Sequence, residues 1–126
     1  MEKKKLLVID DEEDFSYFVK LNLEKTKEFE VLTTSDGEEG IKLAQKTHPD
    51  LILLDILMPK MSGSDVADAL VNNPATKDIP IIFLTALVRK EEEKENEGEI
   101  GGRRFISKPV SVSELISRIK MALLPG

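Results

Sequence analysis

The sequence predicts an α/β fold in which a doubly wound parallel sheet of five strands carries helices on both faces. Short apolar runs alternate along the chain with longer segments of helical periodicity, which is the pattern of repeated βα units. Three of the runs are apolar throughout, as strands buried on both faces must be. Acidic residues directly follow the first and third runs, where the switch-point site of such a sheet would lie.

Five short apolar runs are the candidate strands. In chain order they are Leu6–Ile9, Phe29–Thr33, Leu51–Leu54, Ile79–Leu84 and Phe105–Ile106. The first, third and fourth runs are continuously apolar, whereas the second and fifth lie among polar residues and suit the edges of the sheet. The predicted strand order is therefore 2-1-3-4-5.

Apolar residues at helical spacing follow these runs and predict up to five helices. They are Phe15, Phe18, Val19 and Leu23, then Ile41 with Ala44, Val66 with Leu70, and finally Leu115, Ile116, Ile119 and Leu123. Capping boxes at Ser35-x-x-Glu38 and Ser111-x-x-Glu114 mark two of the helix starts. The segment 89–99 carries six glutamates and no apolar stripe, so we expect a solvated or frayed helix there.

Composition and charge narrow the class of protein. A chain of 126 residues suits one domain, which we expect to span residues 4–124 with no output domain beside it in this chain. The formal charge of −6 argues against direct binding to nucleic acid or to a membrane surface. The lack of cysteine excludes thiolate metal sites and cysteine nucleophiles, and no apolar run approaches the roughly 18 residues of a membrane span. We expect a cytoplasmic protein.

Three carboxylates follow two strands that the predicted order makes neighbours. Asp10 and Asp11 come after the first run and Asp55 after the third. Taken alone, Asp10 or Asp11 is equally well explained as a helix N-cap. Three carboxylates brought together repel one another and raise one another's pKa unless a cation joins them. An all-oxygen ligand set favours Mg²⁺, with Mn²⁺ as the alternative, over zinc.

Two further polar residues belong to the same edge of the sheet. Thr85, followed by Ala86, ends the fourth strand, and Lys108-Pro109 follows the fifth. A metal, an ammonium group and a hydroxyl around a nucleophilic carboxylate are the groups that stabilise a transferring phosphoryl group. Taken separately, Thr85 is an ordinary strand residue and Lys108-Pro109 an ordinary loop, so the joint arrangement carries the prediction.

These residues carry a resemblance to a known family. The motifs are LVIDDEE at 7–13, LDILMPKMSG at 54–63, LTA at 84–86 and SKP at 107–109. In this order, and over nearly the whole chain, they resemble the receiver domain of two-component response regulators, the CheY-like superfamily. The resemblance implies a flavodoxin-like (βα)5 fold and a signalling function in a phosphorelay.

The resemblance also implies a role for each matching residue. Asp55 would accept a phosphoryl group from a histidine kinase or a phosphotransfer protein. Lys108 would pair with Asp55 and then with the phosphoryl oxygens, while Thr85 and the amide of Ala86 would bind the phosphoryl group. The peptide bond before Pro109 would be cis. The phosphorylated receiver would then act on a downstream protein, or on an output domain missing from this chain.

The implied metal site contains three side chains and one backbone group. Asp11 would bind Mg²⁺ directly, Asp10 would assist through water, and Asp55 and the backbone carbonyl of Leu57 would complete the protein ligands. Such a receiver catalyses its own phosphorylation and slow dephosphorylation and is otherwise not an enzyme.

Conformational switching and phosphoryl lifetime are implied by three other positions. Thr85 would move inward and Phe105, the aromatic residue three positions before the lysine, would relay that movement. Leu57 and Leu87 stand two residues beyond Asp55 and Thr85, where members of the family can orient the hydrolytic water. Because neither leucine can bind water, we expect slow self-dephosphorylation.

Three other functions fit parts of this pattern. An aspartyl-phosphate phosphatase needs a second acid two residues after its nucleophile, and Leu57 stands there. A flavin carrier would bind its phosphate after the first strand, where this chain has acids. The alternative that stays open is a receiver-like module that binds partners without being phosphorylated, although all the acids, the threonine and the lysine are present.

Overall fold

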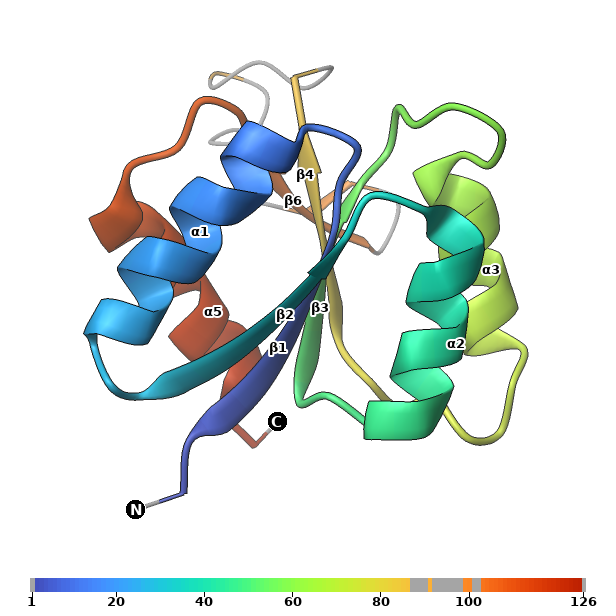
Figure 1. Ribbon diagram of the computed structural model, residues 1–126, viewed down its shortest axis with the longest axis horizontal. Coiled ribbons are helices and arrows are strands. Elements are labelled where there is room, and N and C mark those ends of the chain that lie inside the picture. The colour runs from blue at the N-terminus through green and yellow to red at the C-terminus, as the bar shows by residue number, and fades with distance from the viewer. Residues whose placement is uncertain (1, 87–90, 92–98, 101–102, 126) are drawn as a thin grey trace.

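The computed structural model describes residues 2–86, 91, 99–100 and 103–125, and these form a single sheet between two pairs of helices (Figure 1). The strands are β1 (Lys4–Ile9), β2 (Phe29–Thr34), β3 (Leu51–Asp55), β4 (Ile81–Thr85), β5 (Glu99–Ile100) and β6 (Arg103–Ser107). The helices in this part of the chain are α1 (Glu13–Lys25), α2 (Gly37–Thr47), α3 (Gly63–Val71) and α5 (Val112–Leu123). The segment 89–99, expected as a solvated helix, lies outside the described residues except for Glu91 and Glu99.

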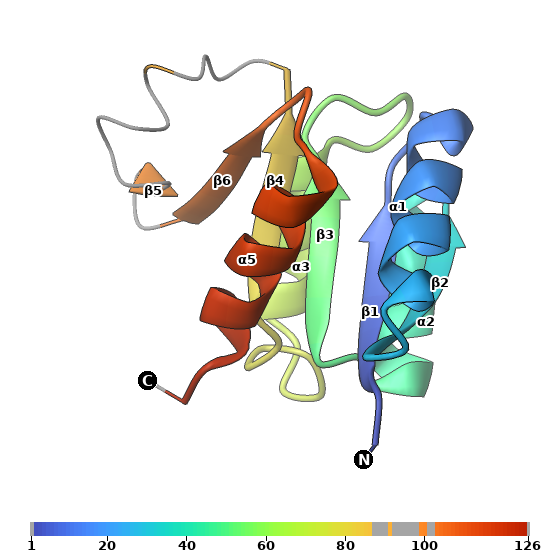
Figure 2. The same ribbon diagram turned by 90° about the vertical axis from the view of Figure 1, so that its left-hand side faces the viewer.

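The sheet has the order β2-β1-β3-β4-β6-β5. Five strands, from β2 to β6 in this order, run parallel, so the predicted arrangement 2-1-3-4-5 is confirmed with β6 as the fifth predicted strand. The short strand β5 was not predicted, and it pairs antiparallel with β6 at the outer edge (Figure 2). Two residues are too few to show the alternation that identifies a strand in a sequence.

Alternate residues of the central strands build two cores, one on each face. Leu6 and Val8 of β1 pack with α1 and α5, whereas Leu7 and Ile9 pack with α2 and α3. Strand β3 is buried along its whole length. Each fully buried leucine or isoleucine contributes about 1.5–3 kcal/mol from the removal of its apolar surface from water. The carboxyl ends of β1 and β3 are therefore held by the most buried part of the molecule.

One of the two predicted capping boxes is wrong by one residue. Asp36, and not Ser35, is the N-cap of α2, and its side chain accepts a hydrogen bond from the backbone N–H of Glu39 at 3.3 Å. Both positions have a glutamate three residues later, so the sequence alone does not separate the two registers. Ser111 caps α5 as predicted, with its hydroxyl accepting a hydrogen bond from the N–H of Glu114.

The outer edge of β2 is closed by two side chains of α1, which we call the β2 clip. Lys20 Nζ donates a hydrogen bond to the carbonyl oxygen of Val31 at 2.7 Å, and the Val31 N–H donates to Glu24 Oε2 at 3.1 Å. Lys20 and Glu24 also form an ion pair of 3.5 Å. An edge strand otherwise offers its unpaired backbone N–H and C=O groups to another chain.

Within the described part of the molecule, every helix is too short or too polar to cross a membrane.

Candidate functional site

The three predicted carboxylates meet at the carboxyl edge of the sheet. Asp10 directly follows β1, Asp11 comes next, and Asp55 is the last residue of the adjacent strand β3. One oxygen atom from each of the three lies within 4.8 Å of the others. Asp10 and Asp55 are buried and Asp11 is exposed. Neither Asp10 nor Asp11 caps α1, because Glu12 occupies the N-cap position.

Lys108 reaches this cluster from the loop after β6. Its Nζ lies 2.7 Å from Asp10 Oδ2, 2.8 Å from Glu12 Oε1 and 3.8 Å from Asp55 Oδ2. Lys108 therefore pairs more closely with Asp10 and Glu12 than with Asp55, the partner that the resemblance implied. The ring of Phe15 lies 4.4 Å from the same nitrogen, measured to the ring centroid, which is within cation–π distance.

Sequence reasoning missed the contributions of Glu12 and Phe15. Glu12 stands in an unbroken run of acids from 10 to 14, where no signal distinguishes one member from the next. Phe15 has the spacing of an ordinary core residue of α1, and it does pack partly against that core.

The charges of the cluster shift two pKa values. Burial raises the pKa of Asp55 from 3.8 to about 7, and the negative charge of Asp10 adds to this effect. The charge of Lys108 acts in the opposite direction without cancelling it, and Asp11 raises the value further. Burial works to lower the pKa of Lys108, but its hydrogen bonds to Asp10 and Glu12 outweigh burial and raise it. A cation added near Asp55 would restore its full ionisation.

The other predicted residues lie at the same edge. Thr85 ends β4 in a buried position, and its carbonyl oxygen accepts a hydrogen bond from the N–H of Lys108 at 3.0 Å. The Lys108–Pro109 peptide bond is cis. Ala86 is exposed and, together with Lys108 and Pro109, lines a depression of about 440 Å³. An open space thus adjoins Lys108 and the end of β4.

The loop between β3 and α3 passes close to the backbone of Asp55. The Gly63 N–H donates a hydrogen bond to the carbonyl oxygen of Ile56 at 2.8 Å. A Cβ atom at Gly63 would lie 2.1 Å from the carbonyl oxygen of Asp55, so glycine alone permits this approach. Leu57, two residues after Asp55, has 60% of its side chain exposed, so it turns away from the core.

Phe105, the predicted relay residue, is packed in a ring stack. It is half-buried on β6 and stacks on Phe83 of β4, with ring centroids 5.3 Å apart. The guanidinium carbon of Arg103 lies 5.5 Å from the centroid of Phe83. The strand register pairs Phe83 with Phe105 and Thr85 with Ser107, so Thr85 and Phe105 belong to the same face of the sheet. Thr85 therefore lies two residues beyond Phe83, on the face of the sheet that carries this stack.

The comparison with known proteins agrees with this geometry. Residues 6–120, which include every residue discussed so far in this site, match the family described as the response regulator receiver domain. The chain belongs to this family. The resemblance inferred from the sequence motifs is therefore confirmed.

The receiver is similar to proteins of known role in bacteria. It is 40% identical over 122 residues to the alkaline phosphatase synthesis transcriptional regulatory protein PhoP of Bacillus subtilis, a match covering 95% of this chain and 48% of that protein. It is 37% identical over 124 residues to the polar-differentiation response regulator DivK of Brucella ovis, which covers 98% of each chain. This receiver thus spans about half the length of the first relative and nearly all of the second.

The fold of the receiver is also found among solved structures. The structure of the Vibrio cholerae chemotaxis protein CheY4 matches with a TM-score of 0.82 and 29% sequence identity. The match covers 97% of this chain and 100% of that chain. The arrangement of helices and strands described above is therefore shared with a solved chemotaxis protein.

Proposed function

We propose that this receiver accepts a phosphoryl group on Asp55 from the phosphohistidine of a histidine kinase or a phosphotransfer protein. The observation that carries the proposal is the position of Asp55, at the end of the fully buried β3 and beside two further carboxylates and Lys108. A nucleophile needs such a fixed position to meet a donor in line. We propose residues 4–124 as the functional domain and the cytoplasm as its location.

The transfer forms one bond and breaks one bond. A carboxylate oxygen of Asp55 attacks the phosphorus atom, an O–P bond forms, and the P–N bond to the donor imidazole breaks. The electron pair of that bond stays on the imidazole nitrogen, which takes up a proton from solvent. Lys108 Nζ, at 3.8 Å from Asp55 Oδ2, is close enough to exchange its contacts with Asp10 and Glu12 for the phosphoryl oxygens. The hydroxyl of Thr85 and the N–H of Ala86 are the other proposed donors.

The donor set of the cluster fits a hard divalent cation. Three carboxylates offer oxygen atoms within 4.8 Å of one another, and one of them, Asp11, is open to solvent. Oxygen ligands, few protein donors and room for water are what Mg²⁺ prefers, and Mn²⁺ suits the same set. We propose Asp10, Asp11, Asp55 and the backbone carbonyl of Leu57 as the ligands. When bound, the cation would neutralise charge on the transferring phosphoryl group.

Phosphorylation is proposed to change the surface that partners recognise. A phosphoryl group adds about −1.5 to −2 charge and three acceptor oxygens, which attract nearby donors such as the Thr85 hydroxyl. Because Thr85 and Phe105 share a face of the sheet, inward movement of one frees space for the other. The downstream partner would be a protein or an attached output domain, with no direct contact to nucleic acid or membrane.

Intact-mass spectrometry tests the proposal. The protein is incubated with phosphoramidate and Mg²⁺, beside a sample with a chelator, the Asp55→Asn variant and the Asp65→Asn variant. Asp65 is an exposed acid on α3 and serves as the matched control. We expect the wild type and Asp65→Asn to gain the mass of one phosphoryl group when phosphoramidate and Mg²⁺ are both present. The chelator sample and Asp55→Asn should gain none. No gain in a folded wild type would reject the proposal in favour of a module that works unphosphorylated.

A further inference from the structure

Lys108 holds two carboxylates closely and leaves a third at a greater distance. Its Nζ lies 2.7 Å from Asp10 Oδ2 and 2.8 Å from Glu12 Oε1, both within hydrogen-bond range. Asp55 Oδ2 lies 3.8 Å away, which is beyond that range. An ammonium group has three N–H donors, so two of them are committed to residues other than the proposed phosphoryl acceptor. Lys108 is thus drawn toward the start of α1.

Glu12 stands at a position where a side chain ordinarily serves the helix. It is the N-cap residue of α1, but its side chain makes no capping hydrogen bond. Short polar side chains are preferred at an N-cap, because their oxygen atoms reach the first N–H groups of the helix. The carboxylate of Glu12 instead extends to Lys108, which is 96 residues away in the sequence. The structure therefore uses this carboxylate on Lys108 and not on the helix.

Asp10 fixes the backbone of Glu12 and the amine of Lys108 at the same time. Its Oδ1 accepts a hydrogen bond from the Glu12 N–H at 2.9 Å, while its Oδ2 accepts one from Lys108 Nζ. The two partners of Lys108 differ in exposure, because the Asp10 side chain is fully buried and 63% of the Glu12 side chain is exposed. An exposed ion pair is weak, whereas a buried one is costly to break. Glu12 is therefore the partner that Lys108 can give up.

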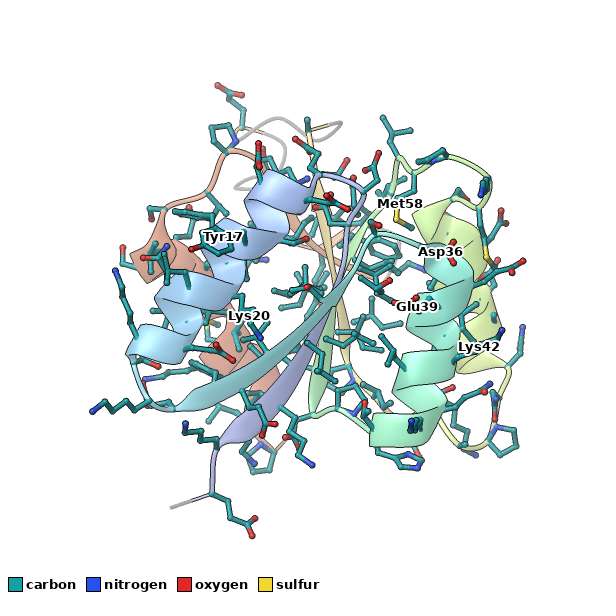
Figure 3. All side chains as sticks on the ribbon, viewed as in Figure 1. Tyr17, Lys20, Asp36, Glu39, Lys42 and Met58 are labelled. Atoms are coloured by element: carbon teal, nitrogen blue, oxygen red, sulfur yellow. The ribbon has the colours of Figure 1, made fainter. Side chains whose placement is uncertain are left out.

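The acids at the start of α2 have no part in this arrangement. Figure 3 shows Asp36 and Glu39 on α2, with β2 passing between them and Lys20 of α1. Among the described residues, the carboxylates paired with Lys108 belong to Asp10, Glu12 and Asp55. Because the other two belong to the proposed metal site, Glu12 is the partner of Lys108 to which no role has been given above.

We infer that Glu12 is a positioning residue that holds Lys108 back from Asp55 until a phosphoryl group competes for the amine. The inference rests on the proposed function, since it takes Asp55 as the phosphoryl acceptor. A phosphoryl group presents three acceptor oxygens and about −1.5 to −2 charge, which exceed what one carboxylate offers. Lys108 then leaves Glu12, keeps Asp10 and turns to the phosphoryl oxygens. Because Glu12 stabilises the arrangement that precedes transfer, its carboxylate slows phosphorylation.

The rate of phosphorylation tests the inference. Wild type, Glu12→Gln, Glu12→Ala and Glu13→Gln are incubated with phosphoramidate and Mg²⁺, and intact-mass spectrometry follows the gain of one phosphoryl group with time. Glu13 is an exposed acid in the first turn of α1, so Glu13→Gln removes the same charge while leaving the contact between Glu12 and Lys108 in place. We expect both Glu12 variants to be phosphorylated about twofold to fivefold faster than the wild type, and Glu13→Gln at the wild-type rate.

The ammonium signal of Lys108 in NMR gives a second measurement, which needs no phosphoryl donor. Ammonium protons held in hydrogen bonds exchange slowly with water, so this signal should be visible at low temperature in protein labelled with ¹⁵N-lysine. Its loss in Lys108→Arg identifies it. We expect the signal to shift or broaden in both Glu12 variants and to stay unchanged in Glu13→Gln. Circular dichroism checks that every variant is folded.

Three results would overturn the inference. If folded Glu12→Gln is phosphorylated at the wild-type rate or more slowly, Glu12 does not hold Lys108 back. If Glu13→Gln accelerates phosphorylation equally, the effect comes from the loss of negative charge alone. A Lys108 signal that is absent in the wild type, or unchanged in Glu12→Gln, would show that Glu12 does not hold the amine. The proposed function survives each of these if the wild type is phosphorylated, whereas a folded wild type that gains no phosphoryl group would end both.

Discussion

Replacing Asp55 by asparagine should stabilise the fold when no divalent cation is present. Burial, together with the charge of Asp10, raises the pKa of the Asp55 carboxyl group from 3.8 to about 7. In the unfolded chain the same group ionises near its ordinary value. The ionised carboxylate is therefore disfavoured in the folded state, and an amide of similar size carries no such penalty.

The magnitude follows from the difference between the two pKa values. At about 1.36 kcal/mol for each pH unit, the difference between 3.8 and about 7 corresponds to at most about 4 kcal/mol. Because the folded state binds the proton more tightly, the wild type loses stability relative to Asp55→Asn as the pH rises from about 4 to about 7, and the gap then levels off. Relaxation and water penetration reduce such penalties, so we expect a gain of about 1–4 kcal/mol at about pH 8.

Urea denaturation followed by circular dichroism measures this gain across the pH range in a chelator. Asp78→Asn, which changes an exposed acid in the loop before β4, is the matched control and should show no comparable trend. Adding Mg²⁺ should narrow this difference in stability. The folded wild type keeps all three carboxylates of the proposed site, so it gains more stability from binding the cation than Asp55→Asn does. The reasoning fails if Asp55→Asn is no more stable than the wild type at the alkaline end, or if its gain is the same at every pH.

Three further changes test other parts of the site. Lys108→Met should cost about 3 kcal/mol of unfolding free energy in urea, because it leaves the buried Asp10 without its ammonium partner; a loss under about 1 kcal/mol would contradict this. Gly63→Ala should cost about 1–3 kcal/mol and lower the melting temperature by several degrees, since its Cβ would press on the Asp55 carbonyl; an unchanged melting curve would show that the loop shifts at little cost. Leu57→Asn should shorten the lifetime of the phosphorylated form in a mass-spectrometric time course, by offering an amide to the hydrolytic water, and an unchanged lifetime would reject the role of this position. Leu87, the other position implied in this role, lies outside the described residues.

Much of the fold was predictable because it depends on local pattern. Runs such as Leu51–Leu54 are apolar on both faces, so they belong inside a parallel sheet, and the polarity of the remaining runs then fixes the order of the strands. The convergence of Asp10, Asp11 and Asp55 follows directly from that order, since the carboxyl ends of parallel strands share one edge.

Other features depend on contacts that no local pattern encodes. The preference of Lys108 for Asp10 and Glu12 over Asp55 is decided by the loop after β6 and the start of α1, which are 96 or more residues apart in sequence. The hydroxyl of Ser16, which has no hydrogen-bond partner among the described residues, is likewise a result of tertiary packing. Nothing in the sequence distinguishes Ser16 from any other small residue of α1. Sequence periodicity assigns a side chain to a face, but the partner on that face comes from tertiary structure.

The β2 clip has a practical consequence for labelling experiments. Fluorophores are often attached to lysines through their amines, and the Lys20 amine is held by Val31 and Glu24. A dye attached to Lys20 would remove the charge of its amine and expose the backbone groups of β2 that the clip covers. The labelled molecules would then be prone to aggregate through strand pairing. A reporter placed instead on an engineered cysteine at Lys60, in the exposed loop before α3, would leave the clip in place.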